Sequence, residues 1–344
     1  MSRALEVLRA HPGVTVQDRG RPGLLAAGVS RGGAVDPTAL AEAAALLGQD
    51  VTEAVEMAAH GAQVRLSGGE AVIALTGAPM RAEADGARLA WPGSHRLPDG
   101  ATLTVGPARA GTYGYLSVDG GLALPELLGA RSAHLAAGIG RALAAGDRLP
   151  LGAARGAPAG RTLDAGNRFS GGTLRLLPSA QTDAFPEAQV ARLESERFAK
   201  DGRANRQGVR LTPEGAGFAV EGGLSVVSEA IVPGDIQIVG AGQPFVLLAE
   251  CQTTGGYPRI ATVISADLPR VAQAPAGAAF DFRFVTLEEA LAARRAAGQA
   301  ARALAGRVRP LVRDPAEIPD LLAYPLIDGV TSGDDADQPE EPRR

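Results

Sequence analysis

The stretch GQPFVLLAECQTTGGYPRIATVISADLPRVAQ, residues 242–273, contains the pattern that decides the fold. Two apolar runs, PFVLLAE and ATVIS, are each short enough for a single strand, and a Gly-Gly pair lies between them. Short runs rich in Val, Ile and Leu that are bounded by glycine or proline are typical of β-strands. Because glycine tolerates positive φ angles, Gly255-Gly256 predicts a tight turn. Small polar side chains and the chain's only cysteine surround this turn, so the stretch is also a candidate site.

The same pattern recurs along the whole chain. Further predicted strands include LEVLRA, VTVQD, AQVRLSG, AVIALTG, ATLTVG and YGYLSVDGG in the first half, and TLRLLP, VRLTP, LSVVSE, DIQIVG and FDFRFV in the second. Helices are predicted at 37–48, where Asp36 can cap and Pro37 suits the first turn, at PEAQVARLESERFA, and at 286–306, where Thr286 and Glu289 form a possible capping box. Without a βαβ rhythm, many short strands favour barrels or sandwiches. We therefore predict a mainly β fold of two β-barrel domains with a few helices.

A composition change divides the chain. Residues 152–172 are rich in Gly, Ala, Arg and Pro, which is typical of a linker or long loop. We expect an N-terminal β-barrel domain at 1–155 and a C-terminal β-barrel domain at 168–296. The extension at 297–344 is expected to be helical at first and then disordered, because its end is acidic and rich in proline.

Composition also limits the class of protein. Of the 344 residues 45% are hydrophobic, as in a chain that can bury a core, and the length allows two domains. The net charge is −4 and no basic stripe with interleaved aromatic residues occurs, which argues against a nucleic-acid partner. The N-terminus has no apolar stretch long enough for a signal peptide, and no run approaches the roughly 18 apolar residues of a membrane span. We expect a soluble cytoplasmic protein without a membrane partner.

Several familiar catalytic motifs are missing. The single lysine, Lys200, stands in FAKDG, so the chain has no phosphate-binding loop of the G-x-x-x-x-G-K-[ST] type. The four histidines are scattered and H-E-x-x-H is absent, so no metal site is expected. Cys251 has no cysteine partner and no obvious local base, and we expect it to pack as a small buried hydrophobic residue.

Two polar clusters occur in the first half. In VQDRGRPGLLAAGVSRGGAVD, which starts at residue 16, Asp18 and Arg21 lie among glycines that include Gly33. Glycines let backbone N–H groups approach an anion, and an arginine fork can pair with a carboxylate or phosphate. The alternative is a turn held by an Asp–Arg pair. In ALTGAPM, Thr76 and Gly77 follow a strand and could expose backbone groups at a sheet end, unless they form an ordinary exit from the strand.

Two more clusters occur in the second half. In NRQGVRL, Asn205 and Arg206 could bind an anion, or the segment could be a solvated entry to a hairpin. In the opening stretch, Gln252, Thr253 and Thr254 follow the carboxylate Glu250 and precede Gly255-Gly256-Tyr257. Neutral polar side chains beside a carboxylate suit an amide or carbonyl ligand. A loop that satisfies its own backbone is the alternative.

These segments resemble one known family. VQDRGRPG, GVSRGGAVD, AVIALTGAPM, GYLSVDGGL, LGARSAHLAAGIG, NRQGVRL, SEAIVPGDIQI and the opening stretch occur in this order in the allophanate hydrolase subunit 2 family. This family is also called KipA-like, and its members are classed among the biotin-dependent carboxyltransferase subunits. The resemblance covers roughly residues 5–295. It implies paired cyclophilin-like β-barrels, which agrees with the strand pattern.

The resemblance implies a function that the residues alone do not. Bacterial members look like one subunit of the ATP-dependent 5-oxoprolinase, which opens the lactam of 5-oxoproline to glutamate. The implied partners are two further subunits, one KipI-like and one of the LamB/YcsF type, and the implied cofactor is ATP with Mg²⁺, shared with those subunits. No covalent biotin is expected, because Lys200 lacks flanking methionines. The alternatives are a carboxyltransferase module of a urea-carboxylase-like enzyme and a non-enzymatic regulator that binds a kinase.

Residue types suited to this chemistry occur in all four clusters. The charged and polar groups expected to take part in catalysis are Arg206, Glu229, Gln252 and Thr253. Residues expected to bind substrate or nucleotide are Asp18, Arg21, Gly33, Thr76, Gly77, Asn205, Thr254, Gly255, Gly256 and Tyr257. Such a subunit is expected to be inactive alone, because the clusters are split and a phosphate-binding loop is absent.

Overall fold

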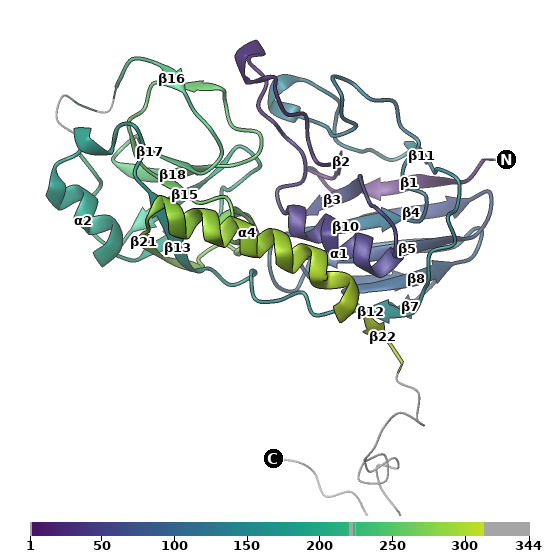
Figure 1. The fold of residues 1–344 in the computed structure, drawn as a ribbon. Helices are drawn as coiled ribbons and strands as arrows, with labels where there is room; N and C mark the ends of the chain where they lie inside the picture. Colours follow the sequence, from purple (N-terminus) through teal and green to yellow (C-terminus); the bar gives the residue numbers. More distant parts are fainter. Residues whose placement is uncertain (1, 220–222, 224, 313–344) are drawn as a thin grey trace, which may run out of the picture.

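Two sheets enclose the core of the N-terminal half (Figure 1). The computed structural model describes residues 2–219, 223 and 225–312. One sheet has the order β11 (Arg148–Pro150), β1 (Ala4–Ala10), β4 (Ala62–Ser67), β9 (Thr102–Ala108), β6 (Met80–Ala84) and β7 (Ala87–Arg88). The other has the order β2 (Thr15–Gln17), β3 (Ala54–Ala58), β10 (Tyr113–Val118), β5 (Ala71–Gly77), β8 (Gly93–Leu97), β12 (Arg161–Thr162) and β22 (Arg309–Pro310).

Strands β5 and β10 are buried on both faces. Ile73 and Leu75 point into the space between the two sheets, where they join the N-terminal core. Val72 and Ala74, on the other face, pack with helix α1 (Pro37–Leu47). A strand covered on both sides is continuously apolar, and this is why AVIALTG does not alternate with polar residues.

The ends of α1 follow the sequence signals. The side chain of Asp36 accepts a hydrogen bond from the backbone N–H of Thr38, and Pro37 occupies the first turn. Gly48 closes the helix with a φ of 65°, a left-handed conformation that glycine adopts without strain.

The C-terminal half forms a closed seven-stranded barrel. Its order is β13 (Gly172–Leu177), β20 (Arg259–Val263), β17 (Asp235–Val239), β18 (Gln243–Leu247), β15 (Gly208–Pro213), β14 (Phe198–Lys200) and β21 (Ala279–Phe284). The pair β13–β21 is parallel and the other pairs are antiparallel. Helices α2 (Glu187–Ser195) and α3 (Leu268–Gln273) lie beside the barrel, and β16 (Glu229–Ala230) pairs with β19 (Thr254–Gly255). The mainly β fold is therefore confirmed.

One predicted strand is wrong. Residues 225–228 of LSVVSE form no strand, and only Glu229–Ala230 pair with Thr254–Gly255, while Leu224 lies outside the described residues. Val227 is 86% exposed, so the apolar run has no core to pack on.

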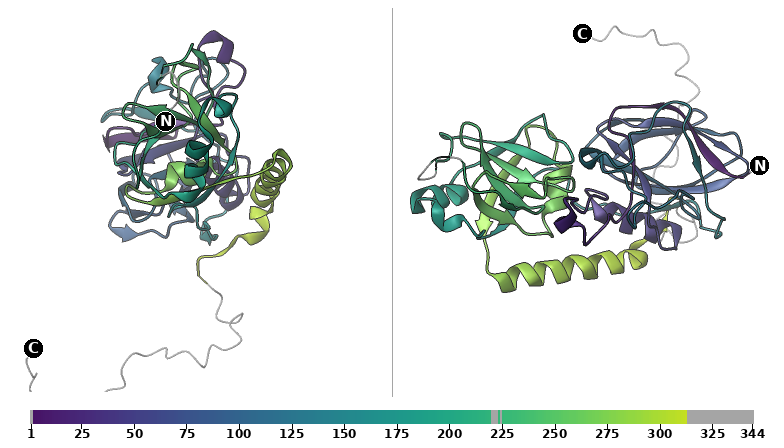
Figure 2. Two further views of the ribbon diagram at one scale, coloured as in Figure 1. Left: turned by 90° about the vertical axis from the view of Figure 1, so that its left-hand side faces the viewer. Right: turned by 90° about the horizontal axis from the view of Figure 1, so that it is seen from above.

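Helix α4 (Leu287–Ala303) leaves the barrel and runs back beside the first domain (Figure 2). Its N-terminus has the expected capping box between Thr286 and Glu289. The short 3₁₀ turn Leu304–Arg307 follows, and β22 then pairs with β12. The part of the extension expected to be disordered, from residue 313 on, lies outside the described residues. No helix within the described ranges is long and apolar enough to span a membrane.

The connection between the two halves packs closely, unlike a free linker. Within 152–172, β12 pairs with β8 through Arg161 and Ser94, and the N–H of Gly160 donates to the carbonyl of Ser94. Arg168 is ion-paired with Asp36 and Glu42 of the first half. The connection is therefore held against the first half by hydrogen bonds and ion pairs. The domain bounds at 155 and 168 stay predictions.

Candidate active site between the two halves

A polar cavity of about 480 Å³ lies where loops of both halves meet. From the first half it is lined by Gly28, Ser30, His134, Ala136 and Ala137, and from the second by Gln207, Glu250, Cys251, Gln252, Thr253 and Thr254. The second half presents most of these groups on the connection from β18 to β19, the stretch with which the sequence analysis begins. The cavity therefore combines a carboxylate, a histidine and neutral hydrogen-bonding groups.

The first-half loop at 18–36 is folded tightly and docked onto the second half. One carboxylate oxygen of Asp18 accepts from the N–H of Gly20 and the other from the N–H of Arg131, both at 2.7 Å. A Cβ on Gly33 would lie 2.5 Å from the backbone nitrogen of Gly20, so this crossing requires glycine. The N–H of Gly32 donates to the carbonyl of Ala249 at 3.0 Å, which fixes the loop against the residue before Glu250.

Ser30 and His134 form a buried pair at the cavity. The Ser30 Oγ lies 2.8 Å from Nε2 of His134, and the two residues are 1% and 2% exposed. The N–H of Ala137 donates to Nδ1 of His134 at 3.2 Å, so Nδ1 is the unprotonated nitrogen of the neutral ring. Nε2 then carries the proton and donates a hydrogen bond to the Oγ of Ser30. Burial lowers the pKa of His134, and the charges of Arg21 and Arg206 act in the same direction against that of Glu250.

Arg206 joins the two halves through two carboxylates. Its Nε donates to Glu250 at 2.6 Å, its Nη1 donates to Glu56 of β3, and its Nη2 donates to the carbonyl of Gly33 at 2.7 Å. The hydroxyl of Tyr115 and the N–H of Val35 donate to the other oxygen of Glu56. Each nitrogen of Arg206 thus has a protein partner, which favours a role in positioning Glu250 over direct binding of an anion.

Arg21 lies behind His134 with part of its guanidinium unpartnered. Nη2 donates to the carbonyl of Ser132 at 2.6 Å, whereas Nε and Nη1 have no hydrogen-bond partner in the described part of the chain. The residue is 1% exposed, and burial lowers its pKa, while Asp18 and Glu250 oppose this. A Cβ added to Gly32 would lie 3.7 Å from Nη1 of Arg21 and 3.1 Å from Cδ2 of His134. The absence of a side chain at Gly32 therefore leaves room for both residues.

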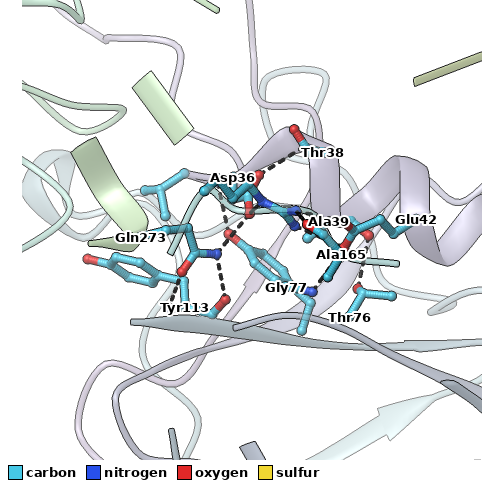
Figure 3. A network of polar contacts seen from close by, with 12 residues as sticks. Asp36, Thr38, Ala39, Glu42, Thr76, Gly77, Tyr113, Ala165 and Gln273 are labelled. Carbon is cyan, nitrogen blue, oxygen red and sulfur yellow. Dashed lines mark hydrogen bonds and ion pairs between the residues drawn. The ribbon is translucent and has the colours of Figure 1, made fainter. Parts of the chain in front are cut away.

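A second polar network continues from this site along the junction of the two halves (Figure 3). Gln273 of α3 donates to Asp36 at 2.8 Å and to the carbonyl of Tyr113 at 2.9 Å, and its Oε1 accepts from the N–H groups of Thr112 and Tyr113. Asp36 and Glu42 share Arg168, and the N–H of Asp36 donates to the hydroxyl of Tyr115. The junction is therefore hydrogen-bonded as well as apolar.

An apolar cavity of about 550 Å³ lies on the other side of the docked loop. Most of its lining is apolar, from Val35, Leu40, Ala41, Ala44, Leu248, Leu268 and Pro269, but Asp18, Arg19, Arg31 and Ser265 line it too. The polar cavity is the better candidate for chemistry, because a carboxylate, a histidine and neutral hydrogen-bonding side chains make up most of its lining.

The structure brings some of the predicted site residues together. Gln252, Thr253 and Thr254 line the polar cavity, and their side chains form no hydrogen bonds with the described residues. Arg206, Gly33, Arg21 and Asp18 lie in the layer behind it, in the contacts given above. Gly255 follows directly in β19, where it pairs with Glu229.

Other predicted residues lie elsewhere. Thr76 donates to the carbonyl of Ala39, and the N–H of Gly77 donates to Glu42, so both serve the packing of α1 on β5 (Figure 3). Asn205 accepts from the N–H groups of Gln207 and Gly208, as in the hairpin-entry alternative. Glu229 is ion-paired with Arg259, and neither it nor Gly256 or the exposed Tyr257 lines the cavity.

Sequence reasoning missed Ser30, Glu56 and His134. Ser30 stands inside the quoted first cluster and His134 inside LGARSAHLAAGIG, but scattered histidines gave no signal because their partners are distant in sequence. Glu56 is in the middle of a buried strand, where a carboxylate requires a partner. The need of a buried carboxylate for a partner was the signal that could have identified Glu56 from the sequence.

Cys251 is a packing residue by its contacts. It is 3% exposed and clusters with Ile231 and Leu247, and burial raises its pKa to about 12. A thiol held protonated at neutral pH is a poor nucleophile.

Comparison with known proteins assigns the chain to a family. Residues 27–284 match the family described as carboxyltransferase domain, subdomain A and B. The chain belongs to this family. It is 36% identical over 298 residues to the C subunit of 5-oxoprolinase from Escherichia coli K12, and 32% identical over 296 residues to that of Haemophilus influenzae. In each case the match covers 85% of this chain and 94% of the relative.

Longer proteins are similar too. A putative urea carboxylase of Emericella nidulans is 27% identical over 316 residues, which cover 85% of this chain and 25% of that protein. The crystal structure of TTHA0988 superimposes with a TM-score of 0.74 and 34% identity, covering 82% of this chain and 56% of the other. The Kluyveromyces lactis urea amidolyase has a TM-score of 0.77 at 23% identity and shares the fold; the match covers 91% of this chain and 21% of that protein.

Proposed function

We propose that this chain is a subunit of an ATP-dependent 5-oxoprolinase that opens 5-oxo-L-proline to L-glutamate. The polar cavity between the two halves is the observation that carries the proposal, because it offers Glu250 and the side chains of Gln252, Thr253 and Thr254 to a small polar ligand. Similarity over 94% of the length of two relatives that are 5-oxoprolinase subunits supports it.

The residues suit a lactam better than a charged group. Gln252 and the threonines donate and accept hydrogen bonds without carrying charge, which matches an amide. Opening a lactam is uphill, and ATP with Mg²⁺ would supply a phosphoryl group to the amide oxygen, which activates the carbonyl carbon for attack by water. The C–N bond would then break as the nitrogen takes up a proton, and hydrolysis of the resulting acyl phosphate would release glutamate and phosphate. The part proposed for this chain is to bind and orient the lactam, with Gln252 and Thr253 at the substrate and Arg206 holding Glu250.

The proposed partners are two companion subunits, one KipI-like and one of the LamB/YcsF type, and we expect the chain alone to be inactive. No phosphate-binding loop is present in the sequence, so the nucleotide is proposed to be shared with those subunits. Lys200 is 4% exposed and donates to the carbonyls of Val271 and Ala272, which supports the expectation that this chain carries no covalent biotin.

Reconstitution with the two companion subunits tests the proposal. The complex should release glutamate from 5-oxoproline only with ATP. Gln252→Ala should reduce kcat/KM at least about a hundredfold with the fold intact, because Gln252 is exposed and its removal disturbs no packing. Cys251→Ala should keep most of the activity. An essential thiol beside a dispensable glutamine would instead indicate covalent catalysis.

A carboxyltransferase acting on urea is the second candidate, favoured by the similarity to a putative urea carboxylase. It would require a biotinylated carrier from another chain. Carboxylation of urea with such a carrier, without turnover of 5-oxoproline, would replace the first proposal.

A further inference from the structure

We propose that Ser30, held by His134, and Glu250 form a donor–acceptor pair that binds the cis-amide edge of the substrate. In a lactam ring the N–H and the C=O point to the same side. A site that reads this edge needs one acceptor for the N–H and one donor for the oxygen, side by side. This inference rests on the proposed function and assigns the residues that select its substrate class.

Ser30 and Glu250 both line the cavity, and contacts to the carbonyl of Ala249 join the segments that carry them. Ser30 Oγ lies 3.4 Å from the carbonyl oxygen of Ala249, the residue before Glu250. Glu250 lines the cavity. One of its carboxylate oxygens accepts from Arg206, and the other accepts from the N–H of Ala136 at 3.3 Å. Ala136 and Ala137 adjoin His134, so one short turn supports both members of the pair.

The hydrogen-bond directions give each member one role. His134 donates to Ser30 through Nε2, because its Nδ1 already accepts from Ala137. The Ser30 hydroxyl proton is then directed away from His134, with only the long contact to Ala249 competing for it. Ser30 is a donor for the amide oxygen in this arrangement, and is not activated as a nucleophile. Glu250 can only accept while it is ionised, as the amide N–H requires.

Arg21 provides an independent observation. The residue is 1% exposed, its Nε and Nη1 are unpartnered within the described residues, and its guanidinium and the His134 ring both lie next to Gly32. A buried positive charge beside the imidazole disfavours its protonation, which keeps Nδ1 free for Ala137. His134 therefore stays neutral and keeps donating to Ser30 through Nε2, although no carboxylate accepts a hydrogen bond from its ring in the described part of the chain.

Binding to the full-length chain tests the pair with three probes: 5-oxoproline, its N-methyl derivative and urea. Ser30→Ala and Glu250→Ala should each weaken 5-oxoproline binding at least tenfold by isothermal titration. Ser117→Ala is the matched control, since Ser117 is also 1% exposed and its Oγ has no partner in the described part of the chain. It should change binding less than twofold. The N-methyl derivative has no amide N–H, so it should bind the unaltered chain weakly. Its affinity should not fall further in Glu250→Ala.

His134 has its own readout as a positioning residue. His134→Asn should keep the bond from the N–H of Ala137 and lose the reach to Ser30, so 5-oxoproline should bind about as weakly as to Ser30→Ala. Affinity of the unaltered chain should fall in acid, at a pH below the ordinary imidazole pKa because burial lowers the pKa of His134, since protonated Nδ1 would face the Ala137 N–H. That pH dependence should be absent in His134→Asn.

The outcomes separate this inference from the proposed function. Normal binding by Ser30→Ala, or binding of the N-methyl derivative as tight as that of 5-oxoproline, would overturn the pair. Failure of all three probes to bind would overturn it too. Binding of urea but not 5-oxoproline, with the same dependence on Ser30 and Glu250, would keep the pair and reject the proposed substrate.

Discussion

Arg206 lies between the carboxylates of Glu56 and Glu250, and this arrangement determines the effect of removing it. Its side chain is 8% exposed and those of the two acids are at most 3% exposed. Breaking a buried ion pair leaves an uncompensated charge that costs about 3–5 kcal/mol. Arg206→Ala should therefore lower the free energy of unfolding by about this amount in urea titrations. A loss of activity without a loss of stability, the simpler expectation from sequence, would show that Arg206 binds substrate.

Arg203→Ala is the matched control for this measurement. Arg203 also pairs with an aspartate, Asp201, but its side chain is 75% exposed and solvent screens the pair. Its substitution should leave the midpoint of unfolding unchanged. Equal midpoints for the Arg203 and Arg206 variants would contradict the structural role of Arg206.

Lys200 makes a prediction about pH. Burial lowers the pKa of this amine from its usual 10.5 to about 7, and its hydrogen bonds go to two carbonyls, those of Val271 and Ala272. Between pH 7 and 10.5 the unfolded chain then binds more protons than the folded chain, so stability from this group rises with pH. The stability of the unaltered chain relative to Lys200→Met should rise by up to about 1.4 kcal/mol per pH unit in this window. A difference that stays constant from about pH 6.5 to about pH 9.5 would mean that Lys200 is charged throughout.

At the scale of elements, local signals were sufficient wherever neighbours in sequence decide the structure. The cap at Asp36, the glycine at Gly48 and the capping box at Thr286 each depend on contacts within four residues, and the structure has all three. The run LSVVSE failed, because β-propensity does not say whether a core is available to cover a strand. The connection at 152–172 is largely the long loop that its composition indicated, but composition could not show that the ion pairs of Arg168 join it to residues more than a hundred positions away.

The site was predictable in the same uneven way. Gln252, Thr253 and Thr254 follow one another on a single connection, so their common position in the cavity could be expected from the Gly-Gly turn. Ser30 and His134 are 104 residues apart, and Glu56 and Arg206 are 150 apart, so only the folded chain pairs them. Thr76 and Gly77 had suitable chemistry, but α1 covers the end of their strand.

On the scale of the whole molecule, the cavity exists because the two halves are held in one arrangement. Each half contributes about half of its lining, so a small rotation between them would separate Ser30 from Glu250. The apolar core also continues across the junction, from α1 into the barrel. The polar contacts of Gln273 fix how the two halves are aligned, since both the oxygen and the nitrogen of its side-chain amide bind groups of the first half.

Gln273→Ala should loosen the junction and leave each half folded. It would leave the N–H groups of Thr112 and Tyr113 and one oxygen of Asp36 without this partner, at about 1–3 kcal/mol for each buried group that water does not reach. Calorimetry should show the unfolding transition broaden or split, and binding of 5-oxoproline should weaken because its site spans the junction. The control is Gln63→Ala, because the half-buried side chain of Gln63 bonds Thr104 within one sheet; this change should leave both measurements unchanged. A single sharp transition with undiminished binding in Gln273→Ala would show that the apolar contacts alone fix the arrangement of the two halves.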